Sequence, residues 1–299
     1  MSEWVIIGVP TSAGAHHAGQ DLAPDALREA GLGERLRAAG VSVTDAGNRP
    51  GSVFAADHDA PGARNLGAVV EVAADVANAV ADAARSGRLP LVLGGDCTIT
   101  IGAVAGLRRV HDDLGLVYVD GDADLWLRDD TSSGILDSTG IWHLLGRGAP
   151  ELSGLGGKAP LLTPDRLAIL GSDPRETSDA GRQFLADSGV SFTEGPAFSA
   201  DPAGTTERAL ATVTGSSERF LVHFDVDVVD SGDLPLGNFP HYGSGVRLDD
   251  VVAGLRVLLR HPSLAGLVLT EVNPTHDPAG AELRRLVDAL VTAIGDGPR

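Results

Sequence analysis

The chain has 299 residues, 43% of them hydrophobic and only 4% aromatic, and its formal net charge at pH 7 is −18. That acidic balance argues against nucleic acid or an anionic membrane as a partner and suits metal ions or a cationic small molecule. No apolar run is long enough to span a bilayer and no signal peptide opens the chain, so we expect a cytoplasmic protein.

Strand and helix patterns alternate along the whole chain. Short apolar runs predict strands at 5–10, 41–45, 89–97, 116–124, 166–171, 190–192, 219–227 and 267–272. Helical periodicity predicts helices from residue 24 to 36, and at 63–86, 99–110, 143–145, 180–188, 205–213, 248–260 and 281–294. This alternation predicts an α/β fold, with a parallel sheet covered by helices on both faces, in a single domain over residues 1–299.

Two of the predicted strands end in aspartates at alternate positions. One run closes with Asp120, Asp122 and Asp124, and the other closes with Asp225 and Asp227. In an extended backbone, residues two apart point to the same face, so we expect each set to converge. Clustered carboxylates repel one another unless a cation neutralises them. Either run alone is more typical of a solvated loop or an Asx turn, but two matching runs favour a two-metal site.

Four motifs in this order resemble those of the ureohydrolases, the family of arginase, agmatinase and formimidoylglutamase. They are the segments 94–97 (Gly-Gly-Asp-Cys), 120–124 (Asp-Gly-Asp-Ala-Asp), 224–227 (Phe-Asp-Val-Asp) and 271–274 (Glu-Val-Asn-Pro). The resemblance covers nearly the whole chain. It implies a three-layer α/β/α fold on a mostly parallel eight-stranded sheet, and homo-oligomers that are often trimers or hexamers. It also implies two Mn²⁺ ions bridged by a hydroxide that attacks a guanidine or amidine carbon.

The resemblance also assigns roles to individual residues. Asp120 and Asp225 would bridge both ions, Cys97 and Asp124 would complete one shell, and Asp122 and Asp227 would complete the other. On this basis Asp124 would accept a hydrogen bond from the bridging hydroxide, and Glu271 would receive the cationic group of the substrate.

Further along the chain, Thr131 and Ser133 stand where the family binds the rest of the substrate. Asp137 stands near the position of a substrate-loop histidine that this chain lacks.

Two departures from the family pattern concern the metals, because the family has histidine at the positions of Cys97 and Asp122. With Cys97 as a thiolate, six anions would face two divalent ions, a surplus of about two negative charges that would raise the pKa of the bridging water. Three alternatives stay open: Cys97 stays protonated, Asp122 binds through water or not at all, or a cationic substrate completes the balance. A thiolate ligand also favours Zn²⁺, Fe²⁺ or Co²⁺ over Mn²⁺.

The remaining histidines are expected to be structural or solvated. His223 shares a face with Asp225, but we expect it to be buried and hydrogen-bonded rather than a metal ligand. His16, His17 and His241 are expected on loops near the mouth of the site.

Two functions are compatible with the sequence. The first is an amidinohydrolase that cleaves a linear C–N bond in a guanidino or amidino small molecule, and the changed substrate loop favours a substrate other than plain arginine. The second is a non-catalytic member that keeps the fold and serves as a binding or partner-stabilising module.

Overall fold

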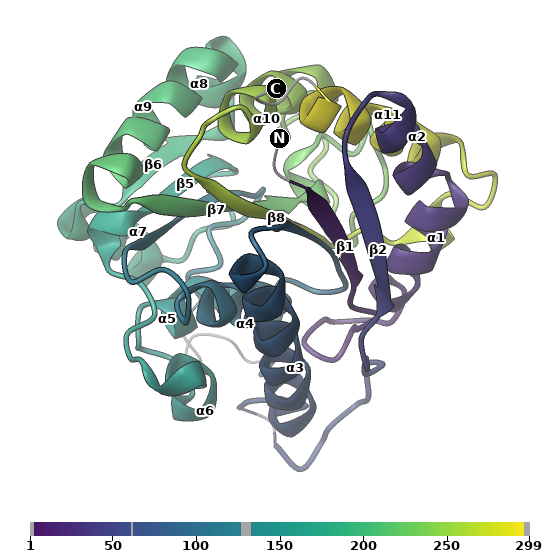
Figure 1. The fold of residues 1–299 in the computed structure, drawn as a ribbon. Helices are drawn as coiled ribbons and strands as arrows, with labels where there is room; N and C mark the ends of the chain where they lie inside the picture. The colour runs from purple at the N-terminus through teal and green to yellow at the C-terminus, as the bar shows by residue number, and fades with distance from the viewer. Residues whose placement is uncertain (1–2, 61, 127–132, 296–299) are drawn as a thin grey trace.

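A single parallel sheet of eight strands forms the centre of the computed structural model, which describes residues 3–60, 62–126 and 133–295 (Figure 1). The spatial order of the strands is β2-β1-β3-β8-β7-β4-β5-β6, and every adjacent pair is parallel. The strands are β1 (Trp4–Gly8), β2 (Val43–Asn48), β3 (Leu89–Leu93), β4 (Leu114–Val119), β5 (Leu167–Ser172), β6 (Ser191–Glu194), β7 (Arg219–Asp225) and β8 (Leu264–Thr270). The predicted eight-stranded α/β fold is confirmed. We propose that residues 1–299 form one domain, because all eight strands join one sheet.

Helices cover both faces of this sheet and make two core layers (Figure 1). One layer contains α1 (Ala23–Glu29), α2 (Leu32–Ala38), α8 (Gly195–Ala200), α9 (Pro202–Ser216), α10 (Leu248–Leu259) and α11 (Ala281–Gly295). The other contains α3 (Leu66–Arg85), α4 (Ile99–Leu107), α5 (Gly140–Leu144), α6 (Pro150–Ser153) and α7 (Asp179–Ser188). Among the described residues, no helix is both long and apolar enough to cross a membrane.

Strand β4 shows how the sequence produces these two layers. All six of its residues are buried, which fits an apolar run in a parallel sheet that is covered on both sides. Val117 and Val119 pack into the first layer, whereas Leu116 and Tyr118 pack into the second. Alternate residues of a strand point to opposite faces, so one short run supplies both cores.

The helix predicted from residue 24 to 36 is two helices. Gly31 lies between α1 and α2 with a φ of 86°, a left-handed conformation that stops a right-handed helix. The apolar periodicity continues across this break, because Leu27, Leu32 and Leu36 are all buried in the same layer. The periodicity identified the buried face but not the break.

The four central strands of the sheet bring the sequence motifs together. Strands β3, β8, β7 and β4 are neighbours in that order, although the chain visits them as third, eighth, seventh and fourth. Because the strands are parallel, their carboxyl ends lie at one edge of the sheet. Cys97, Glu271, Asp225 and Asp120 stand at or just after these ends.

Candidate active site

A cavity of about 500 Å³ opens at the carboxyl ends of the central strands. Its described lining consists of His16, Cys97, Asp120, Asp122, Asp124, Trp126, Ser133, Asp137, Ser138, Glu176, Asp225, Asp227, Phe239, Pro240, His241 and Glu271. The structure therefore brings together all the sequence-predicted site residues that it describes. Thr131 lies outside the described residues.

Asp120 and Asp225 occupy equivalent positions in two tight turns. Oδ1 of Asp120 accepts a hydrogen bond from the backbone N–H of Asp122 at 2.7 Å, and Oδ1 of Asp225 accepts one from Asp227 at 2.8 Å. Each turn fixes its carboxylate through one oxygen. The second oxygen, Oδ2, lies near the sulfur of Cys97 in Asp225 and near Nε2 of His223 in Asp120.

The alternate-face argument fails beyond the strand ends. Strand β4 ends at Val119, and Asp124 has a φ of 46°, so the run of three aspartates is a loop and not an extended strand. β7 likewise ends at Asp225 and is followed by a short 3₁₀ turn, η5 (Val226–Val228). The aspartates still line one cavity, but the turns bring them there.

Three of the predicted ligands have hydrogen-bond partners of their own. Oδ2 of Asp124 accepts from the hydroxyl of Tyr118 at 2.5 Å. Oδ2 of Asp122 accepts from the indole N–H of Trp126 at 3.1 Å, and its Oδ1 accepts from its neighbour Ala123. Oδ1 of Asp227 accepts from the backbone N–H of Gly121 at 3.1 Å. No pattern in the sequence identified Tyr118 and Trp126 as partners of these aspartates.

Glu271 is held in an unusual conformation at the cavity. Its φ is 61°, and Asp124 and Asn65 are the other positive-φ residues besides glycine in the described chain. Such conformations cost energy and tend to occur at functional sites. Oε2 of Glu271 accepts from the side-chain amide of Gln20 at 2.8 Å, while Oε1 is buried without a hydrogen-bond partner. No local pattern in the sequence identified Gln20, which lies 251 positions away.

Cys97 follows a glycine turn after β3. A Cβ on Gly95 would lie 2.2 Å from the carbonyl oxygen of Thr11, so only glycine fits the close approach of these two segments. The backbone N–H of Cys97 donates to Oδ1 of Asp137 at 2.8 Å. Its sulfur lies 2.7 Å from Oδ2 of Asp225. The turn thus directs the thiol into the carboxylate cluster.

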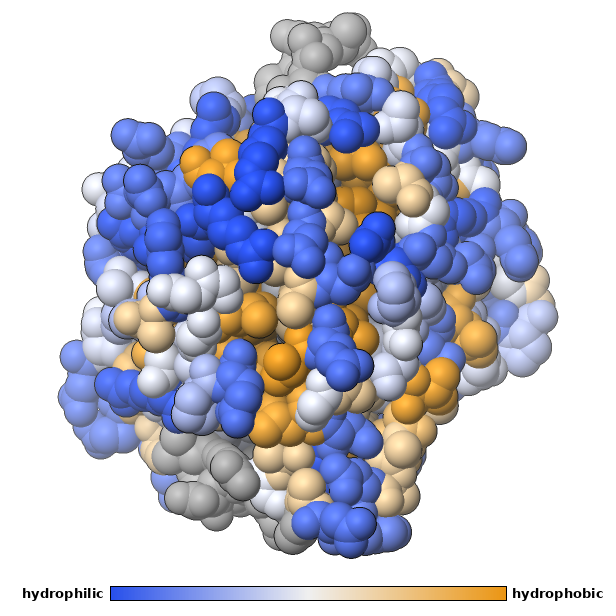
Figure 2. All heavy atoms as spheres, turned by 60° about the horizontal axis from the view of Figure 1, so that its bottom comes forward, coloured by the Kyte–Doolittle hydropathy of each residue, from blue (hydrophilic) through white to orange (hydrophobic). Residues whose placement is uncertain are grey.

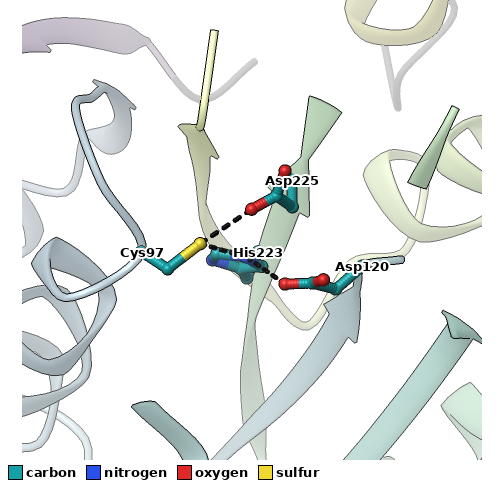
Figure 3. Close-up of side chains that lie close together, drawn as sticks. All are labelled: Cys97, Asp120, His223 and Asp225. Atoms are coloured by element: carbon teal, nitrogen blue, oxygen red, sulfur yellow. Dashed lines mark hydrogen bonds and ion pairs between the residues drawn. The ribbon is translucent and has the colours of Figure 1, made fainter. Parts of the chain in front are cut away.

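His223 is fully buried on β7, as expected. Its ring stacks on Tyr118 with centroids 3.7 Å apart, and Nδ1 lies 2.7 Å from Oγ1 of Thr100. Nε2 faces the cluster, 3.4 Å from Oδ2 of Asp120 and 3.8 Å from the sulfur of Cys97 (Figure 3).

Burial and mutual repulsion raise the pKa of several of these carboxyls. Burial, followed by repulsion from neighbouring carboxylates, raises the pKa of Asp120, Asp225 and Glu271 well above their usual values. Burial is also the main cause that raises the pKa of Asp122 to about 7 and of Asp137 to about 8.

The two other titratable groups of the cluster are also perturbed. Burial and Asp225 raise the pKa of the Cys97 thiol, and burial lowers the pKa of His223 so that its imidazole is neutral. The described lining contains no lysine or arginine to offset the acids.

The arrangement is suited to binding cations. Cys97, Asp120, His223 and Asp225 present ligand atoms that all lie within 4.8 Å of one another, and so do Cys97, Asp137 and Glu271. A third group, Asp173, Glu176 and His241, lies toward the mouth, where Asp173 is paired with Arg175 at 2.6 Å. Only the first two groups are wholly buried. Among the described residues, no arginine or lysine forms an ion pair with either of them as Arg175 does with Asp173.

Comparison with known proteins gives a consistent result. The arginase family model matches residues 2–294. The chain is 29% identical over 292 residues to an arginase of Brevibacillus brevis, covering 97% of each chain, and 29% identical to human arginase-1, covering 96% of this chain and 89% of that one.

Solved structures show the same relation. The crystal structure of arginase from Bacillus subtilis superposes with a TM-score of 0.88 at 26% identity, covering 98% of this chain and 99% of that one. Formimidoylglutamase from the same species shares the fold, with a TM-score of 0.76 at 18% identity. With a family match over nearly all its length and four motifs gathered in one acidic cavity, the chain belongs to the arginase family.

Proposed function

We propose that this protein is a metal-dependent hydrolase that cleaves a linear C–N bond in a guanidino or amidino small molecule. The observation that carries the proposal is the cluster of buried acidic side chains that shares one cavity without an arginine or lysine in its described lining. Buried carboxylates without a basic partner cost several kcal/mol each unless a cation or a proton neutralises them.

The residues present fit a bound metal. Oδ2 of Asp120 and Oε1 of Glu271 are buried and have no hydrogen-bond partner, so a cation in the cavity would satisfy them. We propose two divalent ions, held by Cys97, Asp120, Asp122, Asp124, Asp225 and Asp227, with Mn²⁺ favoured by the family and Zn²⁺, Fe²⁺ or Co²⁺ favoured by Cys97. Such ions, when bound, lower the pKa of water and orient it for attack on the substrate carbon.

The protein's own groups would position the substrate. Glu271, fixed by Gln20, offers a free carboxylate oxygen to the cationic end of a guanidine or amidine. Asp124, anchored by Tyr118 through one oxygen, has a second oxygen that can accept a proton. We propose that Thr131, Ser133 and Asp137 contact the remainder of the substrate, and Ser133 and Asp137 do line the cavity.

The identity of the substrate is a finer proposal. The departure at Asp137 favours a substrate other than plain arginine, whereas the relatives that carry the name arginase make arginine the first compound to assay. The second candidate function is a non-catalytic binding module, and the many anions of the cavity are the observation that favours it. We further propose a cytoplasmic location.

We also propose a homo-oligomer, a trimer or hexamer. The face of the molecule in Figure 2 shows hydrophobic residues near its centre with hydrophilic ones around them, which suits a contact between subunits.

Two measurements test the proposed hydrolase. Metal content is determined after purification and reloading with Mn²⁺, Zn²⁺, Fe²⁺ or Co²⁺, and each loaded form is then screened for urea or ammonia release from arginine and other guanidino and amidino compounds. We expect bound divalent ions and release from at least one compound. Bound metal without any release would favour the binding module, and a protein that binds none of the four metals would overturn the proposal.

A further inference from the structure

Four side chains, from the ends of the neighbouring strands β4 and β7 and from the glycine turn after β3, meet at the floor of the cavity. Figure 3 shows Cys97 entering from the loop after β3, Asp120 from the end of β4, and His223 and Asp225 from β7. Their ligand atoms lie within 4.8 Å of one another, and all four residues are buried. The group offers one sulfur, one imidazole nitrogen and two carboxylate oxygens.

The ring of His223 is held in place for this role. Tyr118 stacks on one face with an angle of 2° between the ring planes, and Thr100 lies 2.7 Å from Nδ1. With the proton on Nδ1 and donated to Thr100, Nε2 presents its lone pair to Asp120 and Cys97. Metal-binding histidines are commonly oriented in this way, by a hydrogen bond from the ring nitrogen that does not bind the metal.

The two aspartates of the group each keep one oxygen for a ligand. Their Oδ1 atoms are used in the backbone turns, so the Oδ2 atoms face the sulfur and the imidazole. Oδ2 of Asp120 has no hydrogen-bond partner although Asp120 is only 2% exposed. A bound cation would satisfy this buried oxygen, which lies beside a thiol and an imidazole.

Asp124, which the family pattern assigns to the same ion as Cys97, is differently placed. Its Oδ2 accepts from the hydroxyl of Tyr118 at 2.5 Å, and it does not belong to the four-residue group. The same tyrosine thus supports His223 with its ring and holds Asp124 with its hydroxyl.

We propose that His223, and not Asp124, completes the coordination of the ion held by Cys97, giving a Cys–His–Asp₂ site that prefers Zn²⁺, Co²⁺ or Fe²⁺ to Mn²⁺. This inference rests on the proposed metal-dependent function and names the ligands of one of its ions. A thiolate and an imidazole are softer ligands than carboxylates, which is the physical reason for the preference. With the neutral imidazole of His223 as a ligand in place of the Asp124 carboxylate, the ligands of the two ions also carry one negative charge fewer.

Cobalt binding to the whole protein tests the proposal without relying on activity. Co²⁺ bound by a thiolate gives a sulfur-to-metal charge-transfer band, and we expect this band in the wild type and its loss in Cys97→Ser. His223→Asn removes Nε2, the proposed metal ligand. The asparagine amide lies near the position of Nδ1 and can still hydrogen-bond to Thr100. We expect this substitution to lower the Co²⁺ and Zn²⁺ affinity by at least about 10-fold, because losing a ligand costs no less than losing a group that orients one. Asp124→Asn, in contrast, should leave the charge-transfer band unchanged.

Two further experiments separate loss of a metal ligand from general loss of structure: a matched histidine variant and a spectroscopic measurement on the wild type. His143→Asn removes another buried histidine, which is bonded to the carbonyl of Thr139 at 2.9 Å in α5, and it should leave affinity unchanged. X-ray absorption of the Zn²⁺-loaded wild type should show one sulfur at about 2.3 Å and an imidazole nitrogen at about 2.0 Å, whether or not the His223 variant folds.

The possible failures are distinguishable. Binding that His223→Asn does not alter, or an absorption spectrum without imidazole or sulfur, would overturn the His223 assignment and leave the hydrolase proposal standing. A wild type that binds no divalent ion would overturn both.

Discussion

The cavities at the two ends of the central sheet differ in the charged side chains that line them, although the same strands connect them. At the carboxyl ends lies the acidic cavity of about 500 Å³. At the amino ends a larger cavity, of about 670 Å³, has Arg88, His111, Arg219 and His261 in its lining and no acid among the described lining residues. Strand β7 illustrates the difference, because it begins at an arginine, Arg219, and ends at an aspartate, Asp225.

What separates the two ends is burial, not size. Arg219 at the amino end is exposed and bonds the carbonyl of Pro262 at 2.9 Å, so solvent and backbone satisfy its charge. Asp120 and Asp225 are 2% and 1% exposed, and their charges face one another. An exposed charge costs little, whereas a buried cluster of like charges requires a proton or a cation. The smaller cavity is therefore the one whose buried charges require a proton or a bound cation.

The largest expected effect is the response of the metal-free protein to pH. The pKa of Asp137 is about 8 and that of Asp122 about 7 in the folded state, against an ordinary value of 3.8, so the folded state binds more protons between pH 4 and 8. This stabilisation is complete below about pH 4 and is lost as the pH rises through 8. We expect the free energy of unfolding to fall by on the order of 5 kcal/mol between pH 5 and 8.

Urea denaturation in the presence of a chelator measures this pH response. Saturating Zn²⁺ or Co²⁺ should flatten it, because bound metal replaces the protons. A metal-free protein that is equally stable at both pH values would contradict the description of the carboxyl ends as a self-repelling cluster.

A second prediction concerns Asp225, which contacts Cys97 and stands at the centre of the cluster. Asp225→Asn should abolish the stabilisation by metal, which for a ligand at 100 times its dissociation constant is about 2.7 kcal/mol. Thermal denaturation with and without metal measures the difference. Because the substitution removes one of several mutually repelling charges, the metal-free variant should be at least as stable as the metal-free wild type, and a strongly destabilised variant would count against this account.

The third prediction tests the hydroxyl that holds Asp124. Tyr118→Phe keeps the ring that stacks on His223 and removes the hydrogen bond to Oδ2 of Asp124. We expect a loss of about 1–2 kcal/mol in the free energy of unfolding, with no change in the Co²⁺ charge-transfer band. A changed band would indicate that Asp124, once released, enters the shell of the Cys97 ion.

The smallest effect is expected at the amino ends of the strands. Arg219→Ala removes an exposed charge, and we expect the free energy of unfolding to change by about 0.5 kcal/mol or less. The metal affinity and the pH response should stay as in the wild type. If either shifted, charges at the two ends of the sheet would be coupled through the strands.

Much of the site could be predicted from the sequence, because it depends on order and residue type. Acidic residues directly after buried strands gather at one edge of any parallel sheet, so Asp120 and Asp225 could be assigned without a structure. The likeness of four motifs to the ureohydrolases gave the family, which the comparisons confirm. Gln20 and Thr100 could not be assigned, because their partners lie 251 and 123 positions away with no local signal.

The alternation of strands and helices, the parallel sheet and the edge where the acids collect could all be predicted from the amino-acid sequence alone. Those features follow from the periodicity of apolar residues and from chain direction, which are local properties. Which side chains contact one another depends on long-range packing: Tyr118 contacts Asp124, Trp126 contacts Asp122, and His223 lies beside Cys97 and Asp120. The rule that alternate residues share a face holds only while the backbone is extended, and β4 ends at Val119, one residue before the first of these aspartates.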